Sequence, residues 1–306
     1  MRIVINGQQA FGKAVLDALI ERGDNVVAVY CAPDKPGRPA DPLKQAAVER
    51  GLPVHQPASF KDPAVLDTLR ALEPDLCVMA YVVLLVPQPI LDAPTHGTIQ
   101  YHPSLLPRHR GPSSINWPII QGETGTGLSI FWPDKGLDTG PVLLQKEIAI
   151  GPDDTLGSIY FEHLFPMGVA AMIEAVDLVK SGAAPKIAQD ETQATYEGWC
   201  RKEDVAIDWS RPAAEVHNLI RGANPQPGAW TTCNGKMLQI YDCVRLAAAD
   251  GVPGEVTEAT TEGLVVAARG GAIQVKRVRP EGDQKMPAGD FVAAGGVKPG
   301  GVLGER

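Results

Sequence analysis

Several features that mark whole classes of protein are missing from this chain. None of its five cysteines pairs with another in a CxxC motif, so we expect reduced thiols and no metal site. No apolar run approaches the roughly 18 residues of a membrane span, and the opening MRIVING reads as a strand rather than a leader. The net charge of −8 argues against broad non-specific binding of nucleic acid. We therefore expect a cytoplasmic protein with no membrane partner.

The first strand-to-helix turn lacks the fingerprint of a dinucleotide-binding fold. Residues 7–12 read GQQAFG instead of GxGxxG, although Asp34 follows the second predicted strand, where a ribose carboxylate could lie. A dinucleotide-dependent oxidoreductase is therefore disfavoured, and we expect no NAD cofactor.

Strands and helices alternate through the first half of the chain. RIVING, NVVAVYCAP, LPVHQP, DLCVMAY and GTIQYH read as strands with helical segments between them, which predicts a doubly wound, Rossmann-like α/β parallel sheet over residues 1–185. A long helical stretch near its end contains Pro166, where we expect a break. Residues 186–204 are polar and aperiodic, and we interpret them as a linker. Residues 205–306 show short strands separated by Gly, Pro and Asn, typical of a small OB-like β-barrel.

The strand TIQYH carries a histidine to the edge of the predicted sheet where ligands bind. Side chains alternate along a strand, so Gln100 and His102 share one face. A Pro-bounded loop follows, containing Ser104, Arg108 and Arg110. A histidine in this position is more often structural than catalytic. Its polar neighbours make a catalytic role about as well supported as a structural one.

A second polar cluster, DKGLDTG, contains Asp134, Gly136 and Asp138. Asp and Gly in a loop most often serve to form the turn and have no catalytic role. A carboxylate beside an imidazole would orient the ring and stabilise its protonated form, yet spacing alone does not join Asp138 to His102.

Two long stretches resemble the folate-dependent formyltransferase family. They are YHPSLLPRHRGPSSINW (101–117) and SIFWPDKGLDTGPVLLQKE (129–147), and the likeness extends to INGQQAFG, ATYEGWCRKEDVAIDW and VHNLIRGANPQPGAW. The first two stretches look closest to the hydrolase domain of 10-formyltetrahydrofolate dehydrogenase. The overall length and QKMPAGDF look closer to methionyl-tRNA formyltransferase.

The resemblance implies that a formyl group passes from 10-formyltetrahydrofolate to an acceptor. His102 and Asp138 match the family's catalytic histidine and carboxylate, and Gln100 stands at the third catalytic position. The folate would lie along an apolar wall and a loop, and the acceptor beside the Pro-bounded loop at Ser104, Arg108 and Arg110. The folate positions that match are Tyr81, Val82, Leu84, Leu85, Val86, Asp134, Gly136 and Leu137.

Two departures from the family pattern leave the acceptor open. Gln100 replaces an asparagine and moves the amide by about 1.5 Å. The segment PDKPGRPADPLKQ is shorter and less basic than the loop with which the tRNA enzymes grip their acceptor. Methionyl-tRNA, a small amine such as an amino sugar, and water therefore all remain, as does a folate-binding protein with little catalysis. We predict no oligomeric state.

Overall fold

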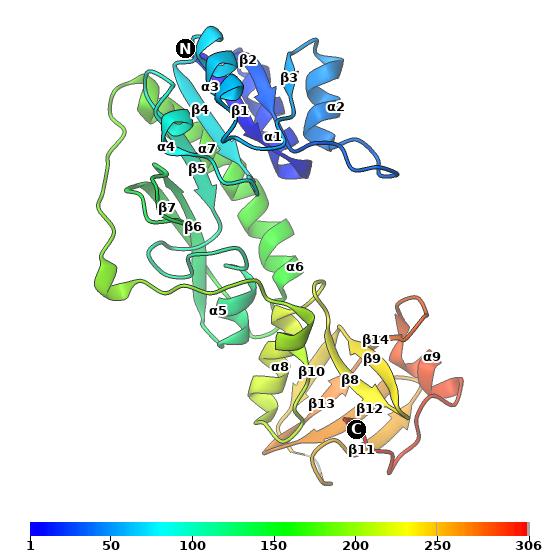
Figure 1. The fold of residues 1–306 in the computed structure, drawn as a ribbon. Helices are drawn as coiled ribbons and strands as arrows, with labels where there is room; N and C mark the ends of the chain where they lie inside the picture. The colour runs from blue at the N-terminus through cyan, green and yellow to red at the C-terminus, as the bar shows by residue number, and fades with distance from the viewer. Residues whose placement is uncertain (249, 305–306) are drawn as a thin grey trace. The chain divides into compact units, whose positions relative to one another are not determined.

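The computed structural model describes residues 1–248 and 250–304, and Figure 1 shows the order of its elements. By internal contacts the chain divides into two compact units. The first comprises Met1–Gly111, Gly127–Glu147 and His163–Tyr196; the second comprises Pro112–Thr126, Ile148–Glu162 and the described residues from Glu197 on. The domain and linker limits expected from the sequence, at residues 185 and 204, stay predictions.

The first half of the chain forms a seven-stranded sheet in the order β3-β2-β1-β4-β5-β6-β7. Strands β1 to β5 pair in parallel, whereas β6 runs antiparallel to β5. The expected α/β class is therefore confirmed, with a mixed rather than wholly parallel sheet. The strands are β1 (Arg2–Gly7), β2 (Asn25–Tyr30), β3 (Val54–His55), β4 (Leu76–Ala80), β5 (Thr98–His102), β6 (Gly125–Phe131) and β7 (Val142–Ala149).

Helices cover the two faces of this sheet (Figure 1). On one face Phe11 of α1 packs against Tyr101 of β5 and Phe165 of α7, with ring centroids 4.4 and 5.5 Å apart. On the other, α3 and α4 pack on a core that includes Val4 and Cys77. The helices of the first half are α1 (Gln9–Glu21), α2 (Pro42–Glu49), α3 (Pro63–Ala71), α4 (Gln88–Leu91), α5 (Asn116–Ile120), α6 (Leu156–Ser158) and α7 (Phe165–Lys180).

Helices α2 and α3 begin with the same local sequence pattern. In each, an aspartate precedes a proline at the first helical position, and the aspartate side chain accepts a hydrogen bond from a backbone N–H of the first turn. The carboxylate satisfies a donor that the helix cannot, and proline needs no such partner there. This pattern explains why both helices begin where the sequence indicates.

The expected break near Pro166 takes the form of a π-helix. Residues Ile159–Leu164 form this wider turn, and α7 begins directly after it. Pro166 has no N–H to donate and its ring crowds the preceding turn, which accounts for the change in helix type. By length and composition alone the stretch Leu156–Lys180 could cross a membrane, but in this structure α7 packs against α1 and β5.

The C-terminal half forms two four-stranded antiparallel sheets that share one hydrophobic core, in agreement with the predicted β-domain. Their orders are β10-β13-β12-β11 and β15-β14-β9-β8. The strands are β8 (Ala229–Cys233), β9 (Lys236–Ile240), β10 (Cys243–Leu246), β11 (Val256–Thr260), β12 (Gly263–Ala268), β13 (Gly271–Val275), β14 (Arg277–Pro280) and β15 (Met286–Pro287), with helices α8 (Ala213–Gly222) and α9 (Ala288–Ala293).

Candidate active site

His102 is the last residue of β5 and is almost fully buried, with 5% of its surface exposed. Its Nε2 lies 2.9 Å from the carbonyl oxygen of His109, in the loop that follows the strand. A carbonyl can only accept, so Nε2 carries the proton and donates it. The Nδ1 edge of the ring is therefore the edge left for a reacting group.

Asp138 lies in the β6–β7 loop and faces that edge. Its Oδ2 is 3.7 Å from His102 Nδ1, beyond hydrogen-bond length but within reach of an ion pair, and accepts a 2.9 Å hydrogen bond from the N–H of Gly111. Only 6% of Asp138 is exposed. The structure thus brings together the imidazole and the carboxylate that sequence spacing alone could not connect.

Gln100 points to the same side of the sheet as His102. It pairs in register with Met79 of β4 and Phe131 of β6, and the Phe131 ring makes an edge contact with the His102 ring. Gln100 is partly exposed. Within residues 1–248 and 250–304, its side-chain amide has no recorded hydrogen bond, so both amide N–H groups stay open to a ligand.

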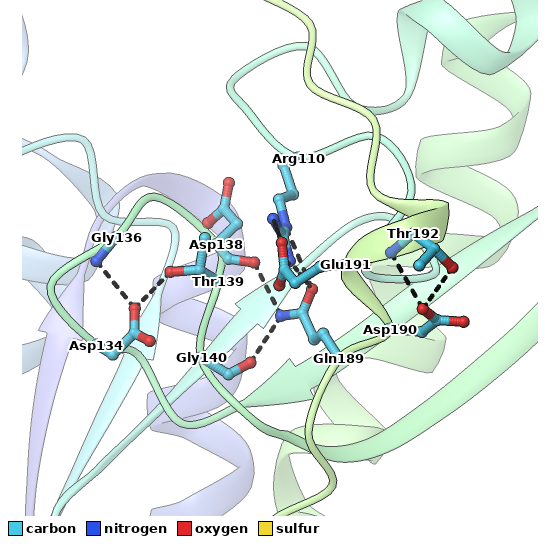
Figure 2. A network of polar contacts seen from close by, with 10 residues as sticks. All are labelled: Arg110, Asp134, Gly136, Asp138, Thr139, Gly140, Gln189, Asp190, Glu191 and Thr192. Atoms are coloured by element: carbon cyan, nitrogen blue, oxygen red, sulfur yellow. Dashed lines mark hydrogen bonds and ion pairs between the residues drawn. The ribbon is translucent and has the colours of Figure 1, made fainter.

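The loop before Asp138 is closed by its own polar side chains. Asp134 Oδ1 accepts hydrogen bonds from the Gly136 N–H at 2.9 Å and from the Thr139 hydroxyl at 2.6 Å (Figure 2). Asp138 itself has a φ of +58°, in the left-handed region that L-residues rarely adopt. The sequence explains the turn, because Asp and Gly suit such conformations, but not the aim of the Asp138 carboxylate.

Gly140 ends this loop where no side chain fits. A Cβ atom there would lie 1.8 Å from the carbonyl oxygen of Trp132. We expect Gly140→Ala to shift the loop and to lower the melting temperature by several degrees, because the clash is with backbone rather than a flexible side chain. Gly198→Ala, at an open position, is the matched control. Equal melting temperatures for the two variants would contradict this assignment.

A small cavity of about 10 Å³, room for about one water molecule, lies in the core on the same face of the sheet. Its lining includes Asn6, Tyr30, Cys77, Met79, Val86 and Thr98. Met79 is the register partner of Gln100, so the cavity adjoins the catalytic face of β5. Burial raises the pKa of Tyr30 to about 12 and that of Cys77 to about 12, so both are uncharged at neutral pH. Among the described residues the buried Tyr30 hydroxyl has no hydrogen-bond partner.

The predicted folate residues divide between the cavity and the surface. Val86 lines the cavity, and Val82 and Leu84 pack on the adjoining core. Tyr81, Leu85 and Leu137 are 48%, 70% and 51% exposed, which gives the loops after β4 and β6 an unusual apolar surface. Asn6, Tyr30, Met79 and Thr98 were not predicted, because on the first strands they read as ordinary core residues.

The predicted acceptor-side residues have different surroundings. Ser104 is fully buried and donates a 2.7 Å hydrogen bond to the carbonyl of Arg108. Arg110 is also buried, with its guanidinium bound to Gln189 and Glu191 (Figure 2). Arg108 is exposed. Of the three, Arg108 alone presents its side chain to solvent, and whether any of them contacts an acceptor stays a prediction.

Residues 1–248 and 250–304 contain no group of three or more His, Cys, Asp or Glu side chains arranged to hold a metal ion. The site therefore consists of the His102–Asp138 pair and the Gln100 amide. Such a set can donate hydrogen bonds to a developing oxyanion and move a proton.

Comparison with known proteins shows which family the chain resembles. The sequence model of the formyl transferase family matches residues 1–176, and that of the formyl transferase C-terminal domain matches residues 200–295. The chain is 40% identical to a methionyl-tRNA formyltransferase of Geotalea uraniireducens, over all of this chain and 99% of that one. It is also 40% identical to the mitochondrial 10-formyltetrahydrofolate dehydrogenase of Mus musculus, over 96% of this chain but only 33% of that protein.

Solved structures share the fold at lower identity. HypX from Aquifex aeolicus, in complex with tetrahydrofolic acid, superposes with a TM-score of 0.72 at 20% identity, over 98% of this chain and 48% of HypX. The N-formyltransferase of Helicobacter canadensis superposes with a TM-score of 0.69 at 18% identity, over 93% of this chain and 99% of its own. The two family matches and the full-length relative together show that the chain belongs to the formyl transferase family.

Proposed function

We propose that this protein transfers the formyl group of 10-formyltetrahydrofolate to an acceptor amine and releases tetrahydrofolate. The observation that carries the proposal is the buried His102–Asp138 pair, 3.7 Å apart, on the same face of the sheet as the Gln100 amide. Family membership supports the same chemistry. We also propose that the enzyme works in the cytoplasm, as expected from the sequence.

In this proposal the folate lies along the loop after β4, outside the cavity of about 10 Å³, which is too small for its ring system. The exposed Leu85 and Leu137 would then cover part of the cosubstrate. Asp134 and Gly136 contribute through the shape of their loop rather than through free side-chain oxygens, because Asp134 Oδ1 is already occupied.

The reaction would proceed by attack of the amine nitrogen on the formyl carbon. A carbon–nitrogen bond forms, the carbonyl oxygen becomes an oxyanion, and the bond to N10 of the folate then breaks. Gln100 would donate a hydrogen bond to the oxyanion, worth about 3 kcal/mol in comparable sites, and His102 would do the same from Nδ1 once that nitrogen has taken the proton of the attacking amine. Asp138 would keep the ring oriented and take part in moving the proton from the attacking amine towards the departing N10.

The charged residues after β1 and β2 bear on which class of acceptor the protein could bind. Lys44 forms an ion pair with Asp34, and Asp41 binds the backbone N–H groups of Gln9 and Leu43. Lys35 and Arg38 of the same segment are exposed and form no ion pair among the described residues, so two cations remain for a phosphate backbone. A contact of that size is small for a tRNA, which favours a small amine. Methionyl-tRNA remains the competing acceptor, since a full-length relative carries that name.

Hydrolysis, with water as acceptor, is the second candidate function. It is favoured by the 40% identity to a 10-formyltetrahydrofolate dehydrogenase and by Gln100, which stands in place of the family asparagine. A longer side chain that displaces the oxyanion donor by about 1.5 Å would change which nucleophile reacts best.

One assay separates these alternatives. The protein is incubated with 10-formyltetrahydrofolate and, separately, a pool of amino sugars, methionyl-tRNA or buffer alone, while tetrahydrofolate release is followed. We expect the fastest release with a small amine, with a rate that changes little between 50 and 200 mM salt. Fast release with tRNA that falls steeply with salt would identify tRNA as the acceptor instead. Equal release in every pool would identify the hydrolase.

A further inference from the structure

Residues 187–196, here named the strap, run beside both loops that carry the site residues. At one end Ile187 and Val142 exchange backbone hydrogen bonds of 2.8 and 2.9 Å beside the β6–β7 loop. At the other, Thr195 accepts the backbone N–H of Arg110 at its carbonyl and that of His109 at its hydroxyl. The strap therefore connects the loop after β5 with the loop after β6.

Gln189 makes the central contacts of the strap (Figure 2). Its Nε2 donates to the carbonyl oxygens of Asp138, at 2.9 Å, and Gly140, at 2.6 Å. Its Oε1 accepts from Nε and Nη2 of Arg110, at 3.2 and 2.8 Å. Both amide hydrogens and the amide oxygen are thus used, and the direction of the amide group is fixed by its partners.

Arg110 is in turn held by a carboxylate of the strap. Its Nη1 and Nη2 bind the two oxygens of Glu191 at 2.9 and 2.7 Å, a bidentate geometry. The hydrogen bond with Arg110 holds the pKa of Glu191 below its usual value, and the same bond raises the pKa of Arg110. A lowered carboxyl pKa means that the pair is complete at neutral pH and is lost only in acid.

The conformation that Gln189 holds is an unfavourable one. Asp138 has a φ of +58°, a region that non-glycine residues adopt only where their surroundings hold them in it. The hydrogen bonds from Gln189 hold the carbonyl of Asp138 itself and that of Gly140, two residues further on. His109, whose carbonyl binds His102, also has a positive φ, of +54°, and its N–H is held by Thr195.

We propose that the strap is a positioning element of the active site and that Gln189 is its principal positioning residue. Gln189 fixes the backbone of Asp138 so that the carboxylate stays opposite His102 Nδ1, and Arg110 with Glu191 fixes Gln189. The inference rests on the proposed roles of His102 and Asp138. Gln189 itself touches neither substrate nor reacting atoms.

The substitution Gln189→Glu isolates this role. Glutamate has nearly the same size and still pairs with Arg110, so the contacts that anchor the strap remain. It has no N–H to donate, and its carboxylate oxygen would face two carbonyl oxygens, so the Asp138 backbone loses its support. We expect kcat to fall 10- to 100-fold, because a displacement of about 1 Å at a reacting group has that effect.

The control is Gln193→Ala, which removes an exposed glutamine of the same strap whose side chain, among the described residues, binds Asp190. Gln189→Ala is measured as a second variant, and kcat is expressed per folded molecule from each melting curve. We expect KM for 10-formyltetrahydrofolate to stay within about threefold, because the loop after β4, where the folate is proposed to lie, does not contact Gln189. A general loss of structure would instead change KM and the melting temperature together.

Two results separate the possible failures. If Asp138→Asn is inactive but both Gln189 variants match Gln193→Ala in kcat per folded molecule, the positioning role is wrong and the proposed function stands. If Asp138→Asn itself keeps wild-type turnover, the site on which this inference rests is wrong. A fall in kcat in Gln189→Glu, with KM and the melting temperature unchanged, is the result that supports the proposal.

Discussion

Replacing His102 by alanine is expected to lower the turnover of 10-formyltetrahydrofolate by at least about 1,000-fold. The side chain has two tasks in the proposed reaction, donation to the oxyanion and proton transfer. Loss of an oxyanion donor commonly costs 100- to 1,000-fold, and loss of a general acid or base costs about 100- to 10,000-fold. The two effects need not multiply, since residues that act as a unit are not additive.

The fold should survive this change. His102 ends β5, and its ring makes one hydrogen bond, to the carbonyl of His109. Truncation creates a small cavity and a melting temperature a few degrees lower. His96→Ala is the matched control, because His96 is exposed and lies just before the other end of the same strand. Turnover by His102→Ala within tenfold of that control would rule out a catalytic imidazole.

Asp138→Asn is expected to lower turnover by about 100- to 1,000-fold with little change in stability. Asparagine has the same shape, and its Oδ1 can still accept the Gly111 N–H that Asp138 Oδ2 accepts. What is lost is the negative charge 3.7 Å from His102 Nδ1, which would stabilise an imidazolium formed during proton transfer. KM for the folate should change little, since the side chain faces the imidazole rather than the loop after β4.

Asp92→Asn provides the control for the loss of one carboxylate. Asp92 is exposed at the end of α4, where it accepts a hydrogen bond from Gln88 that asparagine can also accept. Steady-state kinetics and melting curves of the two variants, measured side by side, separate a local charge effect from a general one. Wild-type kcat in Asp138→Asn would show that its carboxylate plays no part in proton movement.

The sequence predicted the architecture well because its signals are local. Asp–Pro pairs begin α2 and α3, and alternating apolar segments predict the sheet. The direction of β6 was not predictable, since apolar periodicity is the same in parallel and antiparallel strands. The π-helix before Pro166 was predicted only as a break, because proline indicates where a helix is disturbed and not what replaces it.

The site was less predictable, because its geometry depends on contacts between distant segments. His102 and Asp138 were paired by resemblance to a family, whereas their 3.7 Å separation follows from the loops after β5 and β6. Tyr30 gave no signal, since a tyrosine at the end of a strand is ordinary. Gln189 lies in a polar, aperiodic stretch, and only the folded chain shows its amide bound to the backbone of Asp138.

The transfer of labelled formyl from 10-formyltetrahydrofolate to product tests the central claim most directly. The intact protein and His102→Ala are each incubated with formyl-labelled cosubstrate and an amine pool, and labelled formamide is counted against time. The account predicts steady formation of labelled formamide by the intact protein and a rate at least about 1,000-fold lower for His102→Ala. Labelled formamide formed at equal rates by both proteins, or by neither while both remain folded, would contradict it.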